Sequence, residues 1–400
     1  MAVSKKKIYS KWRLAENKAF RLFMFILIFG AIPTLILPAP SSLVASAQVA
    51  NSIPMVSTRG HFDLNTGELL PGHNFTDYTA TNVPGLQVGS CPKELVIFVH
   101  GIWVDGRFGV NALENFTEML DRINMSLAHN DYRFPVVGFS WDSNTTISPD
   151  GSGWNIGKLL AKDNGPKLAQ FVLDYMNTCE EHNQDTKVRL VGHSMGARVI
   201  LSSLQSLDTN QEWNRGHFKI ASVHLLGAAV DNEEVSTSLL YIVRNPLSLF
   251  NLNEWFDPYG IKSAYGKSIE DVVVKFYNLL NTQDKLLGDP KLYQFYDQDR
   301  PLGLDGAQAD ISRPANYIQT DVADQIAPSC DANGDHRPDF PFEKGQEVGI
   351  GDNHAAYIGS RDPLNNKTII DDGAIGVVVS NWNNSTLPVK QFQPSTTTCQ

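Results

Sequence analysis

Residues 188–197 read Val-Arg-Leu-Val-Gly-His-Ser-Met-Gly-Ala, and this stretch decides the fold. Its first four residues are a short, mostly apolar run that is typical of a buried strand, and the residues from Ala197 to Leu207 have the pattern of a helix. Between them lies a G-x-S-x-G motif with Ser194 at its centre. A sharp turn there needs glycine on both sides of the serine, because larger side chains would collide with the strand or the helix. The stretch therefore predicts a strained turn that holds the Ser194 hydroxyl clear of a sheet.

Strands and helices alternate on both sides of this motif. Such alternation builds βαβ units, so we predict an α/β fold with a mostly parallel sheet and helices on both faces. Ligands of such sheets bind at the carboxyl ends of the strands. The helix at 154–176 has a possible interruption at 164–166. The predicted strands are 95–99, 135–139, 188–191, 221–226, 272–279 and 317–322, and the predicted helices are 111–129, 154–176 and 197–207.

The first 47 residues have the order of a secretory signal peptide. A basic leader precedes an apolar run over residues 22–37, and Ala45-Ser46-Ala47 follows as a cleavage site. We expect cleavage before Gln48 and a secreted, extracellular protein. The alternative is that residues 22–37 remain as a membrane anchor, with the rest of the chain facing outside.

Residues 48–90 are rich in Gly, Pro, Ser, Thr and Asn, and we expect an extended segment that wraps around one domain at 91–400. That domain has two expected insertions. Residues 233–268 carry many large apolar side chains, so they form either a lid over an apolar pocket or ordinary helices. Residues 323–350 are a polar loop insertion.

Composition and charge exclude some classes of partner. The 400-residue chain is 42% hydrophobic and has a formal net charge of −10, which becomes about −16 once the basic leader is removed. A domain with this much negative charge repels nucleic acid and anionic lipid, so neither is an expected partner. Export allows disulfides among Cys91, Cys179, Cys330 and Cys399, with three pairings open and no spacing typical of a metal site. Glycosylation signals, which favour a glycoprotein, occur at Asn74, Asn115, Asn124, Asn144, Asn366, Asn383 and Asn384.

The motif Gly192-His193-Ser194-Met195-Gly196 resembles the nucleophile elbow of esterases and lipases of the α/β-hydrolase superfamily. His100-Gly101-Ile102-Trp103 is similar to the His-Gly oxyanion loop of lipases, and the resemblance extends over residues 91–382. It implies that Ser194 is a nucleophile. It also implies that the backbone N–H groups of Met195 and Ile102, with Trp103 as the alternative, form an oxyanion hole.

The same resemblance implies a base and an acid later in the chain, in the order Ser, acid, His. His354 is the expected base, and His336 is the weaker alternative. The expected acid is Asp284, which follows the predicted strand 272–279, and Asp231 is the alternative. His100 and His193 are expected to support these groups.

These expectations describe a secreted serine esterase that cleaves acyl esters, lipid among them, through Ser194, Asp284 and His354, without cofactor, metal or obligate protein partner. Two alternatives stay open. One is a peptidase or thioesterase on the same triad. The other is a non-catalytic surface or adhesion module stabilised by calcium, since residues 331–339 resemble the start of a calcium loop, with His336 and Phe342 departing from the pattern. The sequence leaves open the acyl chain length, the head group and the oligomeric state.

Overall fold

An eight-stranded sheet with the order β2-β1-β4-β3-β5-β6-β7-β8 forms the centre of the fold. The computed structural model describes residues 53–104, 115–146, 152–182, 184–238, 261–288, 300–326, 354–362 and 365–385, all within one compact unit. β2 is antiparallel to β1, and all the other neighbouring strands of this sheet run parallel. The strands are β1 (Met55–Ser57), β2 (Thr79–Thr81), β3 (Glu94–Val99), β4 (Val136–Ser140), β5 (Lys187–His193), β6 (Ser222–Leu226), β7 (Phe276–Leu280) and β8 (Tyr317–Asp321).

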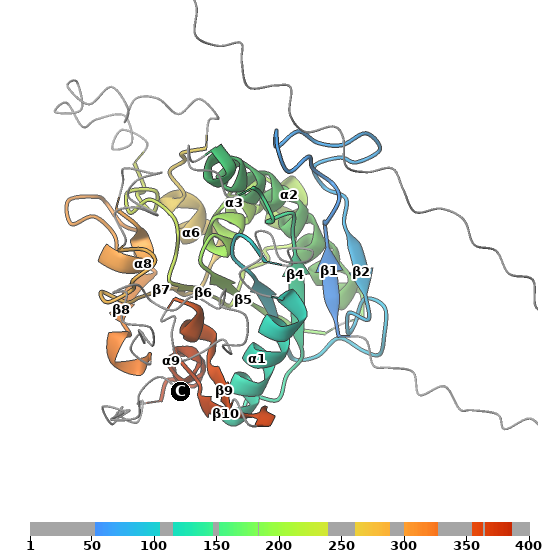
Figure 1. Cartoon of the computed structure of the whole chain (residues 1–400). Coiled ribbons are helices and arrows are strands. Elements are labelled where there is room, and N and C mark those ends of the chain that lie inside the picture. Colours follow the sequence, from blue (N-terminus) through green and yellow to red (C-terminus); the bar gives the residue numbers. More distant parts are fainter. Residues whose placement is uncertain are drawn as a thin grey trace, which may run out of the picture. The chain divides into compact units, whose positions relative to one another are not determined.

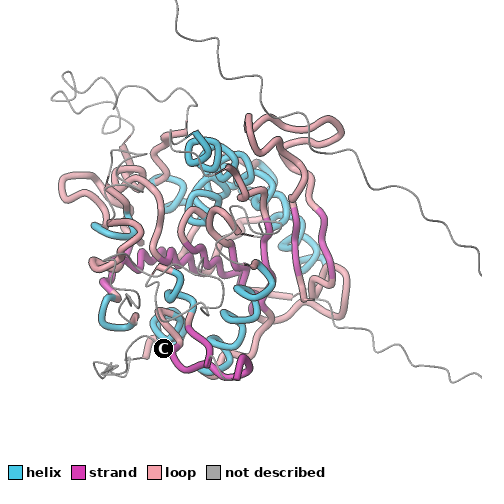
Figure 2. The backbone as a smooth tube through the Cα atoms, viewed as in Figure 1, coloured by secondary structure: helices cyan, strands magenta, loops and turns pink. Residues whose placement is uncertain are grey.

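Helices cover both faces of this sheet, with α2, α3 and α6 on one face and α1 and α9 on the other (Figures 1 and 2). A separate antiparallel pair is formed by β9 (Ser360–Asp362) and β10 (Asn365–Asp371). The helices are α1 (Phe116–His129), α2 (Ser152–Glu181), α3 (Gly196–Asp208), α4 (Gln211–Arg215), α6 (Gly266–Val272), α8 (Leu302–Asp305) and α9 (Ile375–Asn383), with short 3₁₀ helices η2 (Ala323–Gln325) and η3 (Ala355–Ile358).

The two hydrophobic cores follow from the alternation of side chains along buried strands. In β3, Leu95, Ile97 and Val99 point to the core that contains α2 and α3. Val96 and Phe98 point to the other core, which contains α1 and α9. A strand that is buried on both faces must be apolar at every position, and this is why the predicted strands read as continuous apolar runs. The predicted α/β architecture, mostly parallel with helices on both faces, is confirmed.

The expected interruption of the second helix is wrong, because α2 runs unbroken through Pro166. Proline has no N–H, so the carbonyl of Lys162 loses its helical donor. The hydroxyl of Ser202 on α3 donates to that carbonyl instead, at 2.6 Å. A Cβ on Gly165 would lie 2.4 Å from the Cβ of Ser202, so a glycine there lets the two helices approach closely. The neighbouring helix therefore replaces the missing hydrogen bond.

The strand predicted at 272–279 begins later than expected. Val272 is the last residue of α6, and β7 starts at Phe276. Val272 and Val273 are buried by the helix end and by a bridge between Val273 and Ile220, whereas Val274 is exposed. The hydrophobicity of this run alone cannot distinguish such an arrangement from a strand.

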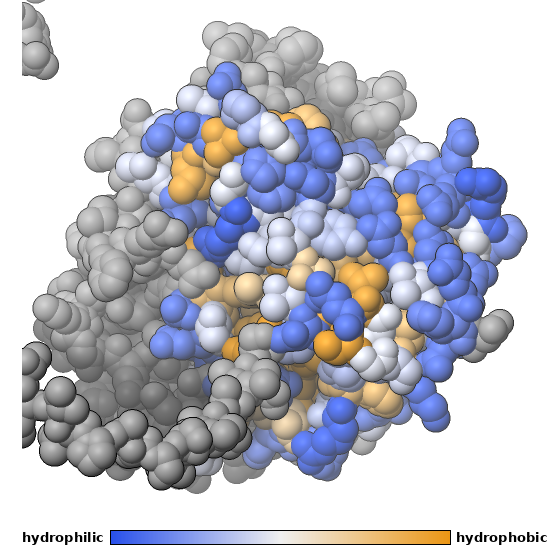
Figure 3. Space-filling view, turned by 90° about the vertical axis from the view of Figure 1, so that its right-hand side faces the viewer, coloured by the Kyte–Doolittle hydropathy of each residue, from blue (hydrophilic) through white to orange (hydrophobic). Residues whose placement is uncertain are grey.

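The N-terminal segment supplies two strands that the sequence did not predict. β1 pairs in parallel with β4, and β2 pairs with β1 at the edge of the sheet. The carboxylate of Asp142 fastens the turn after β1, because it accepts the backbone N–H groups of Gly60, His61 and Phe62 at 2.8–3.0 Å. Hydrophilic residues cover most of the described surface on this side of the molecule (Figure 3).

One disulfide joins Cys91, before β3, to Cys179, near the end of α2. It selects one pairing among those that the sequence left open, while Cys330 and Cys399 lie outside the described residues. The expected signal peptide at 1–47, the calcium-like loop at 331–339 and most of the insertions at 233–268 and 323–350 also lie outside them. None of the helices in the described ranges is long and apolar enough to cross a membrane.

The Cys91–Cys179 disulfide closes a loop of 88 residues in sequence, so it restricts the unfolded chain strongly. We expect the double variant Cys91→Ser/Cys179→Ser to lower the free energy of unfolding by about 2–5 kcal/mol. Urea denaturation followed by circular dichroism measures the change, and wild-type protein treated with reductant should show a similar loss. A double variant with the wild-type midpoint would show that the crosslink contributes nothing.

Candidate active site

Ser194 occupies a strained turn between β5 and α3. Its φ is +54°, a left-handed conformation that side chains other than glycine rarely adopt. The Ser194 N–H donates to the carbonyl of Leu226 at 3.0 Å, and the Ser194 carbonyl accepts from the N–H of Ala229 at 3.2 Å, so the end of β6 fixes the turn from both sides. The strand, turn and helix that the motif requires are all present.

The glycines of the motif allow an unusually close approach of backbone. A Cβ on Gly196 would lie 2.4 Å from the carbonyl oxygen of Val99, at the end of β3. A Cβ on Gly192 would lie 2.6 Å from the side chain of Ile200 on α3. Gly196 is therefore closed to larger residues by backbone, whereas a larger residue at Gly192 would require the side chain of Ile200 to shift.

The loop after β3 packs directly on Ser194. A Cβ on Gly101 would lie 2.8 Å from the Cβ of Ser194. The N–H of Trp103 donates to the carbonyl of Ser143 at 2.8 Å, so this group is already engaged. In the described part of the chain, no backbone acceptor is recorded for the N–H of Ile102 or Met195. Of the two alternatives for the loop donor, this pattern favours Ile102 over Trp103.

The side chains of His354 and Asp284 form a hydrogen bond. Nδ1 of His354 lies 2.7 Å from Oδ2 of Asp284, and both side chains are buried. The other carboxylate oxygen of Asp284 accepts the backbone N–H groups of Leu286 and Leu287, at 3.0 Å each. These bonds hold the carboxylate in the turn after β7, 70 residues before its histidine partner in the sequence. The alternative base, His336, lies outside the described residues.

His193 connects this pair to the serine turn. Its Nε2 lies 2.7 Å from the carbonyl oxygen of His354, and the rings of the two histidines are 4.9 Å apart. A Cβ on Gly227, which follows β6, would lie 3.3 Å from Cε1 of His354. The residue before Ser194 and the turn after β6 thus both contact His354. The structure brings Ser194, Asp284 and His354 to the same carboxyl edge of the sheet.

Asp231, the alternative acid, lies in a different buried cluster. Its Oδ2 is 3.8–3.9 Å from charged nitrogens of Lys158, Arg198 and Lys262. Arg198 also forms an ion pair with Glu234 at 2.8 Å, and all three of Arg198, Asp231 and Glu234 are fully buried. The surroundings of Asp231 are therefore three cations, whereas the surroundings of Asp284 are a histidine and two backbone N–H groups.

The same cluster holds together the two ends of the insertion at 233–268. The backbone N–H of Ser263 donates to the carboxylate of Glu234 at 2.9 Å, and the N–H of Tyr265 donates to the Glu234 carbonyl at 2.7 Å. Both ends of the insertion are thereby held next to α3. Residues 239–260, which carry most of its apolar side chains, lie outside the described residues.

Arg59 contributes to the candidate active site, although the sequence does not identify it. It comes from the N-terminal segment, and its guanidinium lies 3.2 Å from Nε2 of His100 and donates to the hydroxyl of Ser140 at 2.7 Å. Nδ1 of His100 lies 2.8 Å from the carbonyl of Gly101. The arginine and the histidine therefore brace the loop that contacts Ser194. An isolated arginine in a segment rich in turn residues gives no pattern that would identify this role.

Burial lowers the pKa of His100 and of His193 well below the ordinary value of 6.5. For His100 the positive charge of Arg59 adds to the effect of burial, and for His193 the neighbouring His354 does. A neutral His193 can donate one hydrogen bond from Nε2 to the His354 carbonyl. Both histidines are thus neutral supports, as expected from their positions.

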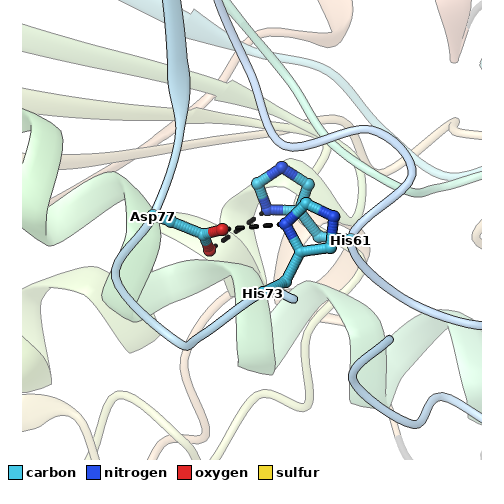
Figure 4. A group of neighbouring side chains, drawn as sticks. All are labelled: His61, His73 and Asp77. Carbon is cyan, nitrogen blue, oxygen red and sulfur yellow. Dashed lines mark hydrogen bonds and ion pairs between the residues drawn. The ribbon is translucent and has the colours of Figure 1, made fainter. Parts of the chain in front are cut away.

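A second cluster has donor atoms of the kind that bind metal ions. His61, His73 and Asp77 place their ligand atoms within 4.8 Å of one another (Figure 4). The buried ammonium of Lys167 lies among them, in contact with the Asp77 carboxylate and 3.0 Å from Nδ1 of His61. Partial desolvation raises the pKa of Asp77, but the hydrogen bonds from Lys167 and His73 outweigh it, so the pKa lies below its ordinary value. A cation already fills this cluster, so we assign it a structural role, in which it fastens the N-terminal segment to α2.

The parallel sheet, its two layers of helices and this edge of the sheet have the arrangement of an α/β-hydrolase fold. Residues 86–252 match a family model described as an alpha/beta hydrolase of unknown function. The chain matches none of the curated proteins with which it was compared.

Among solved structures, similar chains include a cutinase-like protein from Cryptococcus sp. (14% identity over 49% of this chain and 78% of that one, TM-score 0.25). A Pyrococcus furiosus esterase shares 13% identity over 57% of this chain and 73% of its own, with a TM-score of 0.27. A lipase-esterase related protein from Clostridium acetobutylicum shares 11% identity over 57% and 85%, with a TM-score of 0.24.

Burial of histidines makes the stability depend on pH. Burial also lowers the pKa of His224, which stacks on Tyr277 with ring centroids 4.4 Å apart. When the pKa is lower in the folded state, stability is complete above the unfolded pKa of about 6.5 and is lost as the pH falls below it. We expect His224→Phe to reduce this loss by up to about 1.4 kcal/mol per pH unit, measured by urea denaturation at pH 7.5 and pH 5.5. The exposed His182→Gln is the matched control, and equal slopes for both variants would contradict the prediction.

Proposed function

We propose that this protein is an exported serine hydrolase that cleaves carboxylic esters. Ser194 is the nucleophile, His354 the base and Asp284 the acid that orients it. One observation carries the proposal. Nδ1 of His354 and Oδ2 of Asp284 form a buried hydrogen bond, 2.7 Å between the two atoms, beside the strained turn of Ser194. A histidine bonded to a carboxylate through Nδ1 presents Nε2 as the nitrogen that takes a proton.

The proposed reaction has two steps. Ser194 attacks the acyl carbonyl while His354 accepts its proton, and the alcohol leaves with a proton returned by His354. Water then attacks the acyl-enzyme by the same route and releases the acid. The buried carboxylate of Asp284 stabilises the imidazolium that forms in each step. Its two bonds to backbone N–H groups keep it from turning away from His354.

The backbone N–H groups of Met195 and Ile102 are the proposed oxyanion donors. Met195 begins the turn into α3, where the helix N-terminus adds a favourable potential for negative charge. Ile102 belongs to the loop that Arg59 and His100 brace, and Gly101 beside it contacts Ser194. A donor held by such a loop does not need to reorganise when charge develops on the substrate oxygen.

Export is part of the proposal. It rests on the basic and apolar order of residues 1–47, and the disulfide between Cys91 and Cys179 supports it, because such bonds persist in oxidising compartments. Peptides and thioesters are the alternative substrates on the same residues. A non-catalytic module is a weaker candidate, because such a module has no use for a buried Asp–His pair beside a strained serine.

The nucleophile can be tested directly. We expect Ser194→Ala to fold normally, to lose labelling by a fluorophosphonate probe and to lose nearly all turnover of p-nitrophenyl esters. Ser206→Ala is the control, because Ser206 lies on α3 beyond the turn, and this variant should keep both the labelling and the turnover. A panel of acyl esters, thioesters and peptides then identifies the bond cleaved. Probe labelling that persists in Ser194→Ala would place the reactive serine elsewhere and end the proposal.

Variants of the two aspartates should have different effects, one on catalysis and the other on stability. Asp284→Asn should keep the fold and lower kcat by about 10⁴-fold, since a neutral amide favours the wrong histidine tautomer and cannot stabilise the imidazolium. Asp231→Asn removes a buried carboxylate from among three cations, two of which are buried, so it should cost about 3–5 kcal/mol of stability while the folded fraction keeps its kcat. Activity per folded molecule and urea denaturation measure the two effects. If Asp231→Asn were the variant with the lost kcat, the acid would be assigned wrongly.

A further inference from the structure

A cavity of about 540 Å³ lies at the amino ends of β5, β6 and β7. Lys187 lines it at the start of β5, whereas Ser194 follows the other end of the same strand. Seven residues of extended chain separate the two, which is roughly 20 Å. The cavity is therefore distinct from the site around Ser194 and has no role in the proposed ester cleavage.

Basic side chains from three neighbouring strands converge on this cavity. The strand starts are joined by hydrogen bonds from Ala221 N–H to the Val188 carbonyl and from Val274 N–H to the Ile220 carbonyl, both 2.9 Å. Adjacent strands lie about 4.8 Å apart, so the residues around these bonds face a common space. The basic residues that line it are Lys187, Arg189, Lys219 and Lys275.

Two of these cations have only neutral oxygens as their recorded partners within the described residues. Lys219 donates to the backbone carbonyl of Asp271, whose carboxylate pairs with Lys267. Lys275 donates to the side-chain oxygen of Asn384 at 3.1 Å. By contrast, Arg189 and Lys187 share the carboxylate of Glu94, at 2.9 Å and 3.7 Å.

Asp185 is the one acidic residue among the described residues that line the cavity. The cavity is therefore positive within a chain whose net charge is −10. Such a local reversal of sign attracts anions.

The walls of the cavity include two fixed aromatic rings. Trp382 of α9 donates from its indole N–H to the hydroxyl of Ser222 at 3.0 Å, and the guanidinium of Arg189 lies 5.0 Å from its ring. Tyr277 is held flat against His224. Val274 adds an apolar side chain that is 55% exposed. A site with fixed rings and cations suits a ligand that carries both a flat apolar body and a negative charge.

We propose that this cavity binds a small organic phosphate that carries an aromatic ring. The volume lies within the range of about 300–1,000 Å³ typical of small-molecule sites. A phosphate monoester carries up to two negative charges near neutral pH, which matches Lys219 and Lys275 better than a carboxylate does. The ring of this ligand contacts Trp382, which is partly exposed, whereas Tyr277 is 5% exposed and is covered by His224. The acidity of the chain as a whole disfavours a nucleic acid as the ligand.

Isothermal titration calorimetry of the full-length chain with phenyl phosphate tests the proposal. We expect saturable one-site binding that weakens as salt is raised, because exposed charges are screened. The double variant Lys219→Met/Lys275→Met should bind at least about tenfold more weakly. Lys267→Met removes the same charge from α6 outside the cavity and should bind like the wild type. Absence of binding to the wild type, or equal binding to the double variant, would overturn the proposal.

Further ligands and variants measure the contributions of the cations and of the aromatic ring to binding separately. Inorganic phosphate and phenol should each bind at least about tenfold more weakly than phenyl phosphate, because each offers half of the recognised chemistry. Trp382→Leu should weaken phenyl phosphate but leave the weaker binding of inorganic phosphate unchanged. Ser194→Ala should bind phenyl phosphate like the wild type. Loss of binding in Ser194→Ala would place the ligand at the other edge of the sheet and refute the assignment, whatever the outcome for ester cleavage.

Discussion

The contact between the Ser194 turn and the end of β3 is the constraint on which the rest of the site depends. Gly196 lies so close to the carbonyl of Val99 that a single added carbon would overlap it, and Gly101 lies equally close to Ser194. Such close approaches are possible because one partner in each contact is a glycine, which has no Cβ. The positive φ of Ser194 is a consequence, since the chain must leave β5 and enter α3 within two residues. The central sheet, the helix and the loop after β3 are all positioned by this contact.

Two layers of support surround that contact. On one side, Asp284 and His354 come from distant parts of the chain and are fixed by backbone hydrogen bonds to the turn after β7 and by His193. On the other side, Arg59 and His100 brace the loop after β3, for which we propose an oxyanion donor. Burial keeps His100 and His193 neutral, so each can accept a hydrogen bond at one ring nitrogen and donate from the other. Hydrogen bonds therefore fix the supporting residues Arg59, His100 and His193 in position, as they fix the residues that we propose for catalysis.

Much of this arrangement could be predicted from the sequence because it depends on local patterns. Apolar runs identified the central strands, and the turn glycines identified Ser194 through sterics alone. The resemblance to α/β hydrolases favoured Asp284 over Asp231 as the acid, because of the strand that Asp284 follows. Other features depend on contacts between distant segments. The hydroxyl of Ser202 allows α2 to continue through Pro166, and neither residue signals this by itself. The same holds for the pairing of β1 with β4 and for Arg59, which have no periodic pattern in the sequence.

The pairing of β1 with β4 has a consequence for how the chain reaches its folded state. β1 is the first of the described strands to be synthesised, yet its partner follows it by about eighty residues. The carboxylate of Asp142 and the ammonium of Lys167, which hold the turn after β1 and the loop before β2, come later still. The contacts of the N-terminal segment with β4 and α2 can therefore form only after these later parts of the chain have been synthesised. The same docking covers the edge of β4 and, through Arg59, supports the loop after β3 that contacts Ser194.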